Sequence, residues 1–222
     1  NERNDADYQF YKMHDALSMP LQLPEVSKGD CLLFGSFFAV NHKVRHYVKA
    51  MLEQSVAADA IIYYDINFRS SHLPDLPEMM PRLIENMSLA TVVRGSHEDF
   101  QLLFGCDNAE EVYEKHVGSR CSLFIYTDAE RPVQVFTPHF RTQYPAQSIQ
   151  TVSTIGAGDN FNAGFCYAIL QNGIKSAEML RSADESMFGR LIDMAQCFSS
   201  HVCQSIENYI SIDYARRISG KA

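Results

Sequence analysis

A glycine-rich segment followed by an acidic residue has the clearest capacity for chemistry in this sequence. Residues 151–165 are Thr-Val-Ser-Thr-Ile-Gly-Ala-Gly-Asp-Asn-Phe-Asn-Ala-Gly-Phe. The small residues Gly156, Ala157 and Gly158 allow the backbone to turn tightly and to approach a ligand without side-chain clashes. The spacing of apolar residues predicts a helix over 159–170, whose unpaired amides and positive dipole end would face this turn. A phosphate group would bind well there.

Asp159 would place a carboxylate beside this anion site. A carboxylate next to bound phosphates is suited to accepting a proton, and it would activate a hydroxyl group for phosphoryl transfer. The alternative is that Asp159 only caps a helix after a glycine-rich turn, because short glycine motifs are common. The sequence has no G-x-x-x-x-G-K-S/T motif, which excludes phosphate binding by a P-loop.

Residues 151–165 closely resemble the C-terminal signature of the PfkB/ribokinase family of carbohydrate kinases. The resemblance implies that Asp159 is the general base and that the amides of Gly156, Ala157 and Gly158 stabilise the transferring phosphoryl group. Gly158 would also contact the nucleotide. The resemblance further implies ATP as the phosphate donor, Mg²⁺ as its metal ion and a small sugar as the acceptor.

A second segment resembles the D-x-N-x-R motif of the same family. It lies at the end of an apolar run over 60–64 and supplies Asp65, Asn67 and Arg69 as candidate contacts for substrate or phosphate. Arg69 could neutralise phosphate charge with its planar guanidinium group. The structural alternative is a surface arginine that holds down the proline-rich loop after it.

Residues 94–105 occupy the place of the family's N-x-x-E-x-x-x-L-x-G segment. This alignment puts Ser96 at the Asn, near the nucleotide, and Asp99 at the Glu that organises water around Mg²⁺. Both residues differ from the family pattern, and the adjacent Glu98 is a substitute for the acidic position. The alternative is a solvated helix start, where both carboxylates would interact favourably with the helix dipole.

Three further positions concern the nucleotide site. Thr127 matches the threonine of the family's T-L-G segment, whereas Ala129 replaces its glycine. Gln196 lies in the stretch that usually lines the adenine pocket and is a candidate nucleotide contact. Ser153 stands where the family usually carries Asp, and losing that carboxylate should change local ordering more than the base.

Composition limits the class of protein. The chain has 222 residues, of which 46% are hydrophobic and 21% charged, as is ordinary for a globular protein with a substantial core. The formal net charge of −8 argues against broad contact with nucleic acid. No apolar run approaches the length of a membrane span, so no membrane partner is expected. Six scattered cysteines without a CxxC pair favour reduced thiols in a cytoplasmic protein.

Short apolar runs alternate with longer amphipathic stretches, which predicts an α/β fold with a mainly parallel sheet. The resemblance implies a three-layer sandwich of the ribokinase type, in which helices flank this sheet, plus small β lid elements. Strands are predicted at 31–34, 60–64, 89–93 and 121–126, with an edge or antiparallel strand at 132–136. Asn41 is the predicted N-cap of the helix after the first strand.

We expect two parts along the chain. Residues 1–30 would be a remnant of the lid strands with a connection, and residues 31–222 the α/β kinase core that carries the nucleotide and catalytic site. The family has further strands and a Gly-Gly turn before this point, so an upstream segment is expected in the natural polypeptide. The apolar strand at 31–34 agrees, because as an exposed edge it would favour aggregation. Lid strands in this family pair between subunits, which suggests a homodimer.

The sequence therefore predicts ATP-dependent phosphorylation of a hexose hydroxyl group, as in fructokinases. One alternative is a nucleoside kinase with the same fold. The other is a non-catalytic regulator that binds a sugar or a nucleotide, which the departures at Ser96, Asp99, Ala129 and Ser153 would support. Asp159 argues against the regulator, because a pure binding protein needs no base at that position.

Overall fold

The computed structural model describes residues 22–220, which form two compact units. The sheet unit comprises residues 22–145 and Gly173–Glu185, and the helical unit comprises Ala146–Asn172 and 186–220. The expected lid remnant at residues 1–30 lies mostly outside the described residues, so that boundary stays a prediction.

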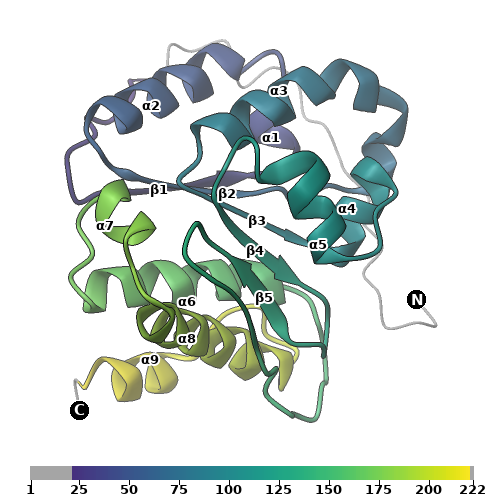
Figure 1. Ribbon diagram of the computed structural model, residues 1–222. Helices are drawn as coiled ribbons and strands as arrows, with labels where there is room; N and C mark the ends of the chain where they lie inside the picture. The colour runs from purple at the N-terminus through teal and green to yellow at the C-terminus, as the bar shows by residue number, and fades with distance from the viewer. Residues whose placement is uncertain (1–21, 221–222) are drawn as a thin grey trace. The chain divides into compact units, whose positions relative to one another are not determined.

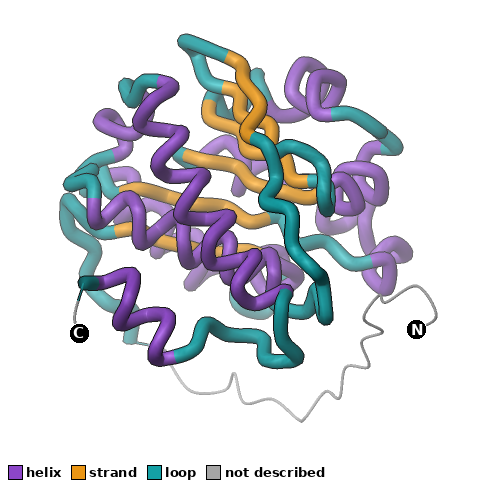
Figure 2. The backbone as a smooth tube through the Cα atoms, turned by 90° about the horizontal axis from the view of Figure 1, so that it is seen from below, coloured by secondary structure: helices purple, strands orange, loops and turns teal. Residues whose placement is uncertain are grey.

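One mixed sheet of six strands forms the centre of the sheet unit, with its strands side by side (Figure 2). The strands follow each other in sequence order, and the first four are parallel. They are β1 (Cys31–Gly35), β2 (Ile61–Asp65), β3 (Val92–Ser96), β4 (Leu123–Thr127), β5 (Val133–Phe136) and β6 (Arg141–Tyr144). The strand predicted at 132–136 is confirmed as antiparallel, and it lies between β4 and β6 rather than at an edge.

The helices that connect the parallel strands pack on one face of this sheet. Each strand is added on the same side of the preceding one, and right-handed crossovers then bring all connecting helices to the same face. Figure 1 shows α2 and α3 lying together above the strands. The helices are α1 (Ser36–Val40), α2 (Arg45–Ala57), α3 (Leu76–Leu89), α4 (His97–Phe104) and α5 (Ala109–Val112), with a 3-10 helix (Ser70–Asp75) and a π-helical turn (Tyr113–Val117).

Strand β2 is buried on both of its faces. Ile62 and Tyr64 of β2 belong to a core that includes Leu83 of α3. Ile61 and Tyr63 alternate with them and therefore point to the opposite face, yet all four β2 residues are at most 1% exposed. Burial on both faces is typical of a strand inside an α/β sandwich, as the sequence predicts.

β1 forms one edge of the described sheet. It pairs with β2 alone among the described strands, and its Leu33 is 43% exposed. At the end of β1 the backbone comes very close to β2, because a Cβ built on Gly35 would lie 1.9 Å from the carbonyl oxygen of Asp65. Only glycine allows this approach.

Two predicted element starts are wrong by three residues. α3 continues to Leu89 and β3 starts at Val92, because the apolar residues before β3 fit the face of a helix as well as a strand. Asn41 is not the N-cap of α2, which begins at Arg45. Asn41 instead follows the last residue of α1, where its amide donates to the carbonyl of Phe38.

The helical unit is built on α6 (Ala157–Gln171), α8 (Glu185–Cys203) and α9 (Ile212–Ser219). Only the first residue of α8, Glu185, belongs to the sheet unit instead. The short α7 (Ala177–Arg181) belongs to the sheet unit. α6 and α8 lie side by side (Figure 1), with Phe161 and Phe165 of α6 buried as predicted. Within residues 22–220, no helix combines the length and apolar character needed to cross a membrane.

Gly164 allows α6 and α8 to pack backbone against backbone. A Cβ on Gly164 would lie 2.7 Å from the carbonyl oxygen of Met194 and 2.8 Å from the Cα of Ala195, and neither atom can rotate away. We therefore expect Gly164→Ala to lower the free energy of unfolding by about 1–3 kcal/mol in urea titrations, in spite of alanine's higher helix propensity. Ala163→Leu is the control, because Ala163 is exposed and should change stability by less than about 0.5 kcal/mol. Equal stability of wild type and Gly164→Ala would contradict the close packing.

Candidate functional site

The glycine-rich turn lies in the helical unit, directly before α6. Gly156 is the N-cap residue and has a φ of 79°, in the left-handed region that glycine adopts without strain. A Cβ on Gly156 would also lie 2.8 Å from the carbonyl oxygen of Asn208. Backbone conformation and close contact therefore both require glycine here.

The start of α6 offers open donors and an open carboxylate. The amide of Ala157 donates to the carbonyl of Thr154 at 3.1 Å, whereas those of Gly156 and Gly158 have no acceptor among the described residues. Asp159 is the third residue of the helix rather than its cap, and it is exposed. Within residues 22–220 its carboxylate forms no hydrogen bond or ion pair. The structural alternative, in which Asp159 caps the helix, is therefore wrong.

Backbone contacts hold the segment before the turn. The amides of Val152 and Ser153 both donate to the carbonyl of Cys203 at the end of α8, at 2.8 and 3.2 Å. The hydroxyl of Ser153 accepts from the amide of Ile155 at 3.3 Å. Ser153 thus keeps a local role at the position where the family usually has a carboxylate.

Gln196 lies on α8 and is only 6% exposed. Its Nε2 is buried and has no hydrogen-bond partner in the part of the chain that the structure describes. A buried amide without an acceptor costs about 1–3 kcal/mol, so a ligand acceptor at this atom would be favourable. The expected contact between Gln196 and a nucleotide stays a prediction.

In the sheet unit, polar side chains gather at the carboxyl ends of three neighbouring strands. Arg94 of β3 donates through Nη1 to Oδ1 of Asp65 in β2 at 3.0 Å, and through Nη2 to Oγ1 of Thr127 in β4 at 2.8 Å. Asp65 and Arg94 are 5% and 8% exposed. One guanidinium group therefore links the ends of all three strands.

This ion pair fixes the charge of Arg94 and occupies Asp65. Burial is the largest single influence and would lower the pKa of Arg94, but the neighbouring groups Asp65, Tyr63 and Asp99, with Asp65 foremost, together outweigh it and raise that pKa above its usual value. Arg94 therefore stays charged. Asp65 is paired with Arg94 in this structure, and the expected contact of Asp65 with substrate or phosphate stays a prediction.

Asp99 joins the loop after β2 to the start of α4. Its Oδ1 accepts from the amide of Phe68 at 2.6 Å, and its Oδ2 accepts from the amide and hydroxyl of Ser96 at 2.6 and 2.7 Å. Ser96 is the N-cap and accepts in return from the amide of Asp99, which completes a capping box. Burial raises the pKa of Asp99, while the hydrogen bonds from Ser96 oppose the change. The solvated position considered for Asp99 is therefore wrong.

Glu98, unlike Asp99, is exposed in the first turn of α4. Among the described residues, no group of three or more His, Cys, Asp or Glu side chains could hold a metal ion by itself. Mg²⁺ carried on nucleotide phosphates needs only one or two protein carboxylates and keeps several waters. Glu98 fits this requirement better than Asp99, whose two oxygens already accept three hydrogen bonds.

Asn67 and Arg69 follow β2 and are both half-buried. Asn67 has a φ of 40°, in the left-handed region that asparagine tolerates better than most residues. Arg69 directly precedes the 3-10 helix that begins at Ser70. The D-x-N-x-R residues thus lie at and directly after the end of β2. The first of them, Asp65, is hydrogen-bonded to Arg94.

Arg94 is a central residue of this site that the sequence patterns did not predict. The signal was a charged residue directly after two valines in a predicted strand, where a charge is rarely buried unless it has a partner. Its partners Asp65 and Thr127 are 29 and 33 positions away, so the sequence alone did not identify them.

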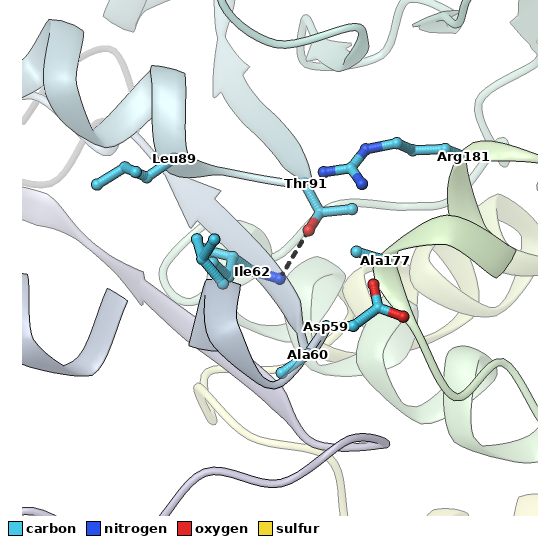
Figure 3. Close-up of a pocket in the computed structure, with 8 residues that line it drawn as sticks. Asp59, Ala60, Ile62, Leu89, Thr91, Ala177 and Arg181 are labelled. Atoms are coloured by element: carbon cyan, nitrogen blue, oxygen red, sulfur yellow. Dashed lines mark hydrogen bonds between the residues drawn. The ribbon is translucent and has the colours of Figure 1, made fainter. Parts of the chain in front are cut away.

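A small cavity opens at the opposite, amino-terminal ends of β2 and β3 (Figure 3). Ile62, Thr91, Asp59, Ala177 and Arg181 are among the residues that line it, and Thr91 accepts a hydrogen bond of 3.1 Å from the Ile62 amide. Its volume of about 90 Å³ is well below that of a typical ligand site. It therefore does not correspond to a nucleotide or sugar site.

Comparison with known families identifies the class of protein. Residues 3–187 match the model of the pfkB family of carbohydrate kinases, and the chain belongs to this family. The chain is 26% identical over 185 residues to a fructokinase from Rhizobium leguminosarum bv. trifolii and 27% identical over 192 residues to probable fructokinase-4 from Arabidopsis thaliana. These matches cover 81% of this chain in each case, and 56% and 59% of the relatives. The chain thus spans little more than half their length.

Solved structures agree on the fold. A fructokinase from Vibrio cholerae O395 with bound fructose, ADP and calcium ion matches with a TM-score of 0.72 at 21% identity, over 85% of this chain and 60% of that one. An aminoimidazole riboside kinase from Salmonella enterica, bound to aminoimidazole riboside and an ATP analogue, matches with a TM-score of 0.69 at 18% identity, over 84% and 60%. The predicted ribokinase-like α/β fold is confirmed.

Removing one partner of the Asp65–Arg94 pair should strongly destabilise the protein. Asp65→Asn and Arg94→Met should each lower the free energy of unfolding by about 3–5 kcal/mol, because an uncompensated buried charge remains. The double variant should lose less than the sum, by about 1–3 kcal/mol, in a double-mutant cycle followed by urea unfolding. Lys115→Met is the control, because it breaks only an exposed ion pair with Glu111 and should leave stability nearly unchanged. Additive losses in the cycle would contradict a direct interaction.

Ala129 has a φ of 45° at the position where the family has glycine. The left-handed conformation costs an alanine about 1–2 kcal/mol, of which part is offset because glycine loses more entropy on folding. We expect Ala129→Gly to raise the free energy of unfolding by about 0.5–1 kcal/mol. Ala50→Gly, inside α2, should lower it by about 1 kcal/mol. If both substitutions destabilise equally, the strain at Ala129 is absent.

Proposed function

We propose that the protein carrying this chain transfers the γ-phosphoryl group of ATP to a hydroxyl group of a hexose, as a fructokinase-like sugar kinase. The observation that carries the proposal is the exposed Asp159 beside the open amides of Gly156 and Gly158 at the start of α6. Membership of the carbohydrate kinase family and relatives named fructokinases support it. Because the chain spans little more than half of those relatives, the activity is proposed for the whole protein.

In the proposed reaction, Asp159 accepts the proton of a primary hydroxyl group of the sugar, while the oxygen of that hydroxyl group attacks the γ-phosphorus. The bond between that phosphorus and the bridging oxygen breaks, and ADP leaves. The amides of Gly156 and Gly158 donate to the phosphoryl oxygens as negative charge develops on them. Ala157, expected to do the same, donates to Thr154 in this structure and so contributes by shaping the turn.

Residues of the sheet unit are proposed as nucleotide and phosphate contacts. Arg69 offers a planar fork for phosphate oxygens, and Asn67 offers an amide beside it. Thr127, Ser96 and, in the helical unit, Gln196 are proposed nucleotide contacts. Mg²⁺, when bound with the nucleotide, would neutralise phosphate charge. Glu98 would contact that ion through water.

The cellular setting completes the proposal. All six cysteines are free, which suits a reducing compartment such as the cytoplasm, where ATP is available. A homodimer paired through lid strands stays part of the proposal. A nucleoside kinase is the second candidate, because one structural neighbour is named as acting on a riboside.

Acceptor-dependent ADP release tests the function. In a coupled assay with the full-length protein, ADP release should require Mg²⁺ and should be fastest with a hexose such as fructose among a panel of sugars and nucleosides. Asp159→Asn keeps the shape of the side chain but removes the base, so kcat should fall by roughly 10²–10⁴-fold while nucleotide affinity changes little.

Asp193→Asn provides the matched control, because Asp193 is an exposed carboxylate on α8 outside the proposed site. It should leave kcat unchanged. Equal ADP release with and without every acceptor would reject the kinase and favour the non-catalytic regulator. Preference for a nucleoside would select the second candidate, and an unchanged kcat in Asp159→Asn would reject the base.

A further inference from the structure

Asn160 forms the contact that joins the catalytic turn to a distant loop. Its side-chain Nδ2 donates to the carbonyl of Gly156 at 2.9 Å and to the carbonyl of Asn208 at 3.0 Å. An amide nitrogen carries two hydrogens, so each carbonyl can receive one. Asn160 is 8% exposed, whereas Asn208 lies in the exposed loop between α8 and α9.

The contact with Gly156 acts on a single peptide plane. The carbonyl of Gly156 accepts from both the backbone amide and the Nδ2 of Asn160, each at 2.9 Å. The same peptide unit ends in the amide of Ala157, which donates to the carbonyl of Thr154 at 3.1 Å. Hydrogen bonds therefore hold this rigid plane at both of its ends.

Fixing that plane orients the amides on either side of it. The amide of Gly156 precedes the plane and the amide of Gly158 follows it, and these are the two donors of the turn that remain open. Glycines on both sides give the turn little stiffness of its own. The direction of both donors therefore depends on contacts from outside the turn, and Asn160 provides one of them.

The contact with Asn208 holds the turn from the other side. The carbonyl oxygen of Asn208 would lie 2.8 Å from a Cβ on Gly156, so loop and turn are already in close contact. Asn160 binds both carbonyls through one nitrogen and so prevents the loop from moving away. The loop over 204–211 thereby supports the turn although it is far away in sequence.

We propose that Asn160 is a positioning residue for phosphoryl transfer, which it supports by clamping the Gly156 peptide to the Asn208 loop. This inference rests on the proposed kinase function. Asn160 touches neither substrate in this role. It acts through the amides of Gly156 and Gly158, whose alignment determines how well they stabilise the transferring group.

Asn160→Leu tests the clamp, because leucine has a similar size and no donors. We expect kcat to fall by about 10²-fold with the KM values for ATP and sugar little changed, since the amides act mainly on the transition state. Asn160→Ser should lose less, because its hydroxyl can still reach the carbonyl four residues back but not Asn208. It also keeps the proposal testable if the leucine variant does not fold.

Asn172→Leu is the matched control, because Asn172 is the C-cap residue of the same helix. Asn172 also donates from its side-chain amide to the carbonyl four residues back, that of Ala168 at 2.8 Å, but at the other end of α6. It should leave kcat unchanged. Equal losses of kcat in the Asn160 and Asn172 variants, or a rise in KM without a change in kcat, would overturn the positioning role.

Hydrogen exchange separates this proposal from the proposed function. Asn160→Leu should speed exchange at the amides of 156–159 and of 204–211 together, and Asn172→Leu should not. If the wild type releases no acceptor-dependent ADP, the kinase function fails, while faster exchange in both segments still supports the clamp. Unchanged exchange in 204–211 would overturn the clamp even in an active kinase.

Discussion

The burial of one ion pair constrains the arrangement of the strand ends in the sheet unit. Taking Asp65 and Arg94 out of water costs several kcal/mol per ion, so the pair must keep good geometry and further hydrogen bonds to remain favourable. Thr127 supplies one such bond, and the ends of β2, β3 and β4 are therefore held in register. The close approach of Gly35 to the Asp65 carbonyl adds β1 to the same arrangement.

The residues that depart from the family pattern have local structural roles in this chain. Ala129 retains a left-handed conformation that glycine would adopt more easily. Ser153 replaces a carboxylate and takes a hydrogen bond inside the turn segment. Ser96 and Asp99 replace Asn and Glu and still form a complete capping box.

Local patterns predicted most of the fold, because strand runs and helical periodicity depend on neighbouring residues. These patterns predicted the four parallel strands and the helix after the glycine-rich turn. Element boundaries were displaced where an apolar stretch, such as that at Leu89, fits a helix as well as a strand. The site was predicted less completely. Asp99 rather than Glu98 is buried because it forms a capping box with Ser96. A Ser-x-x-Asp pattern in the sequence indicates such a capping box, so this part of the site could have been predicted. The Arg94 ion pair and the Asn160–Asn208 contact join distant residues, and single-sequence patterns do not reveal such contacts.

The sequence order of the strands affects how the chain can acquire its structure during synthesis. Neighbouring parallel strands start about 30 residues apart, so each can pair with its predecessor soon after it leaves the ribosome. The helical unit differs, because Gly173–Glu185 interrupts it and belongs to the sheet unit. A nascent chain that ends after α7 would contain every described strand. Of the three helices that form the helical unit, it would contain only α6. The glycine-rich turn before Asp159 would therefore gain its supporting contacts at Cys203 and Asn208 only after these later segments have been synthesised.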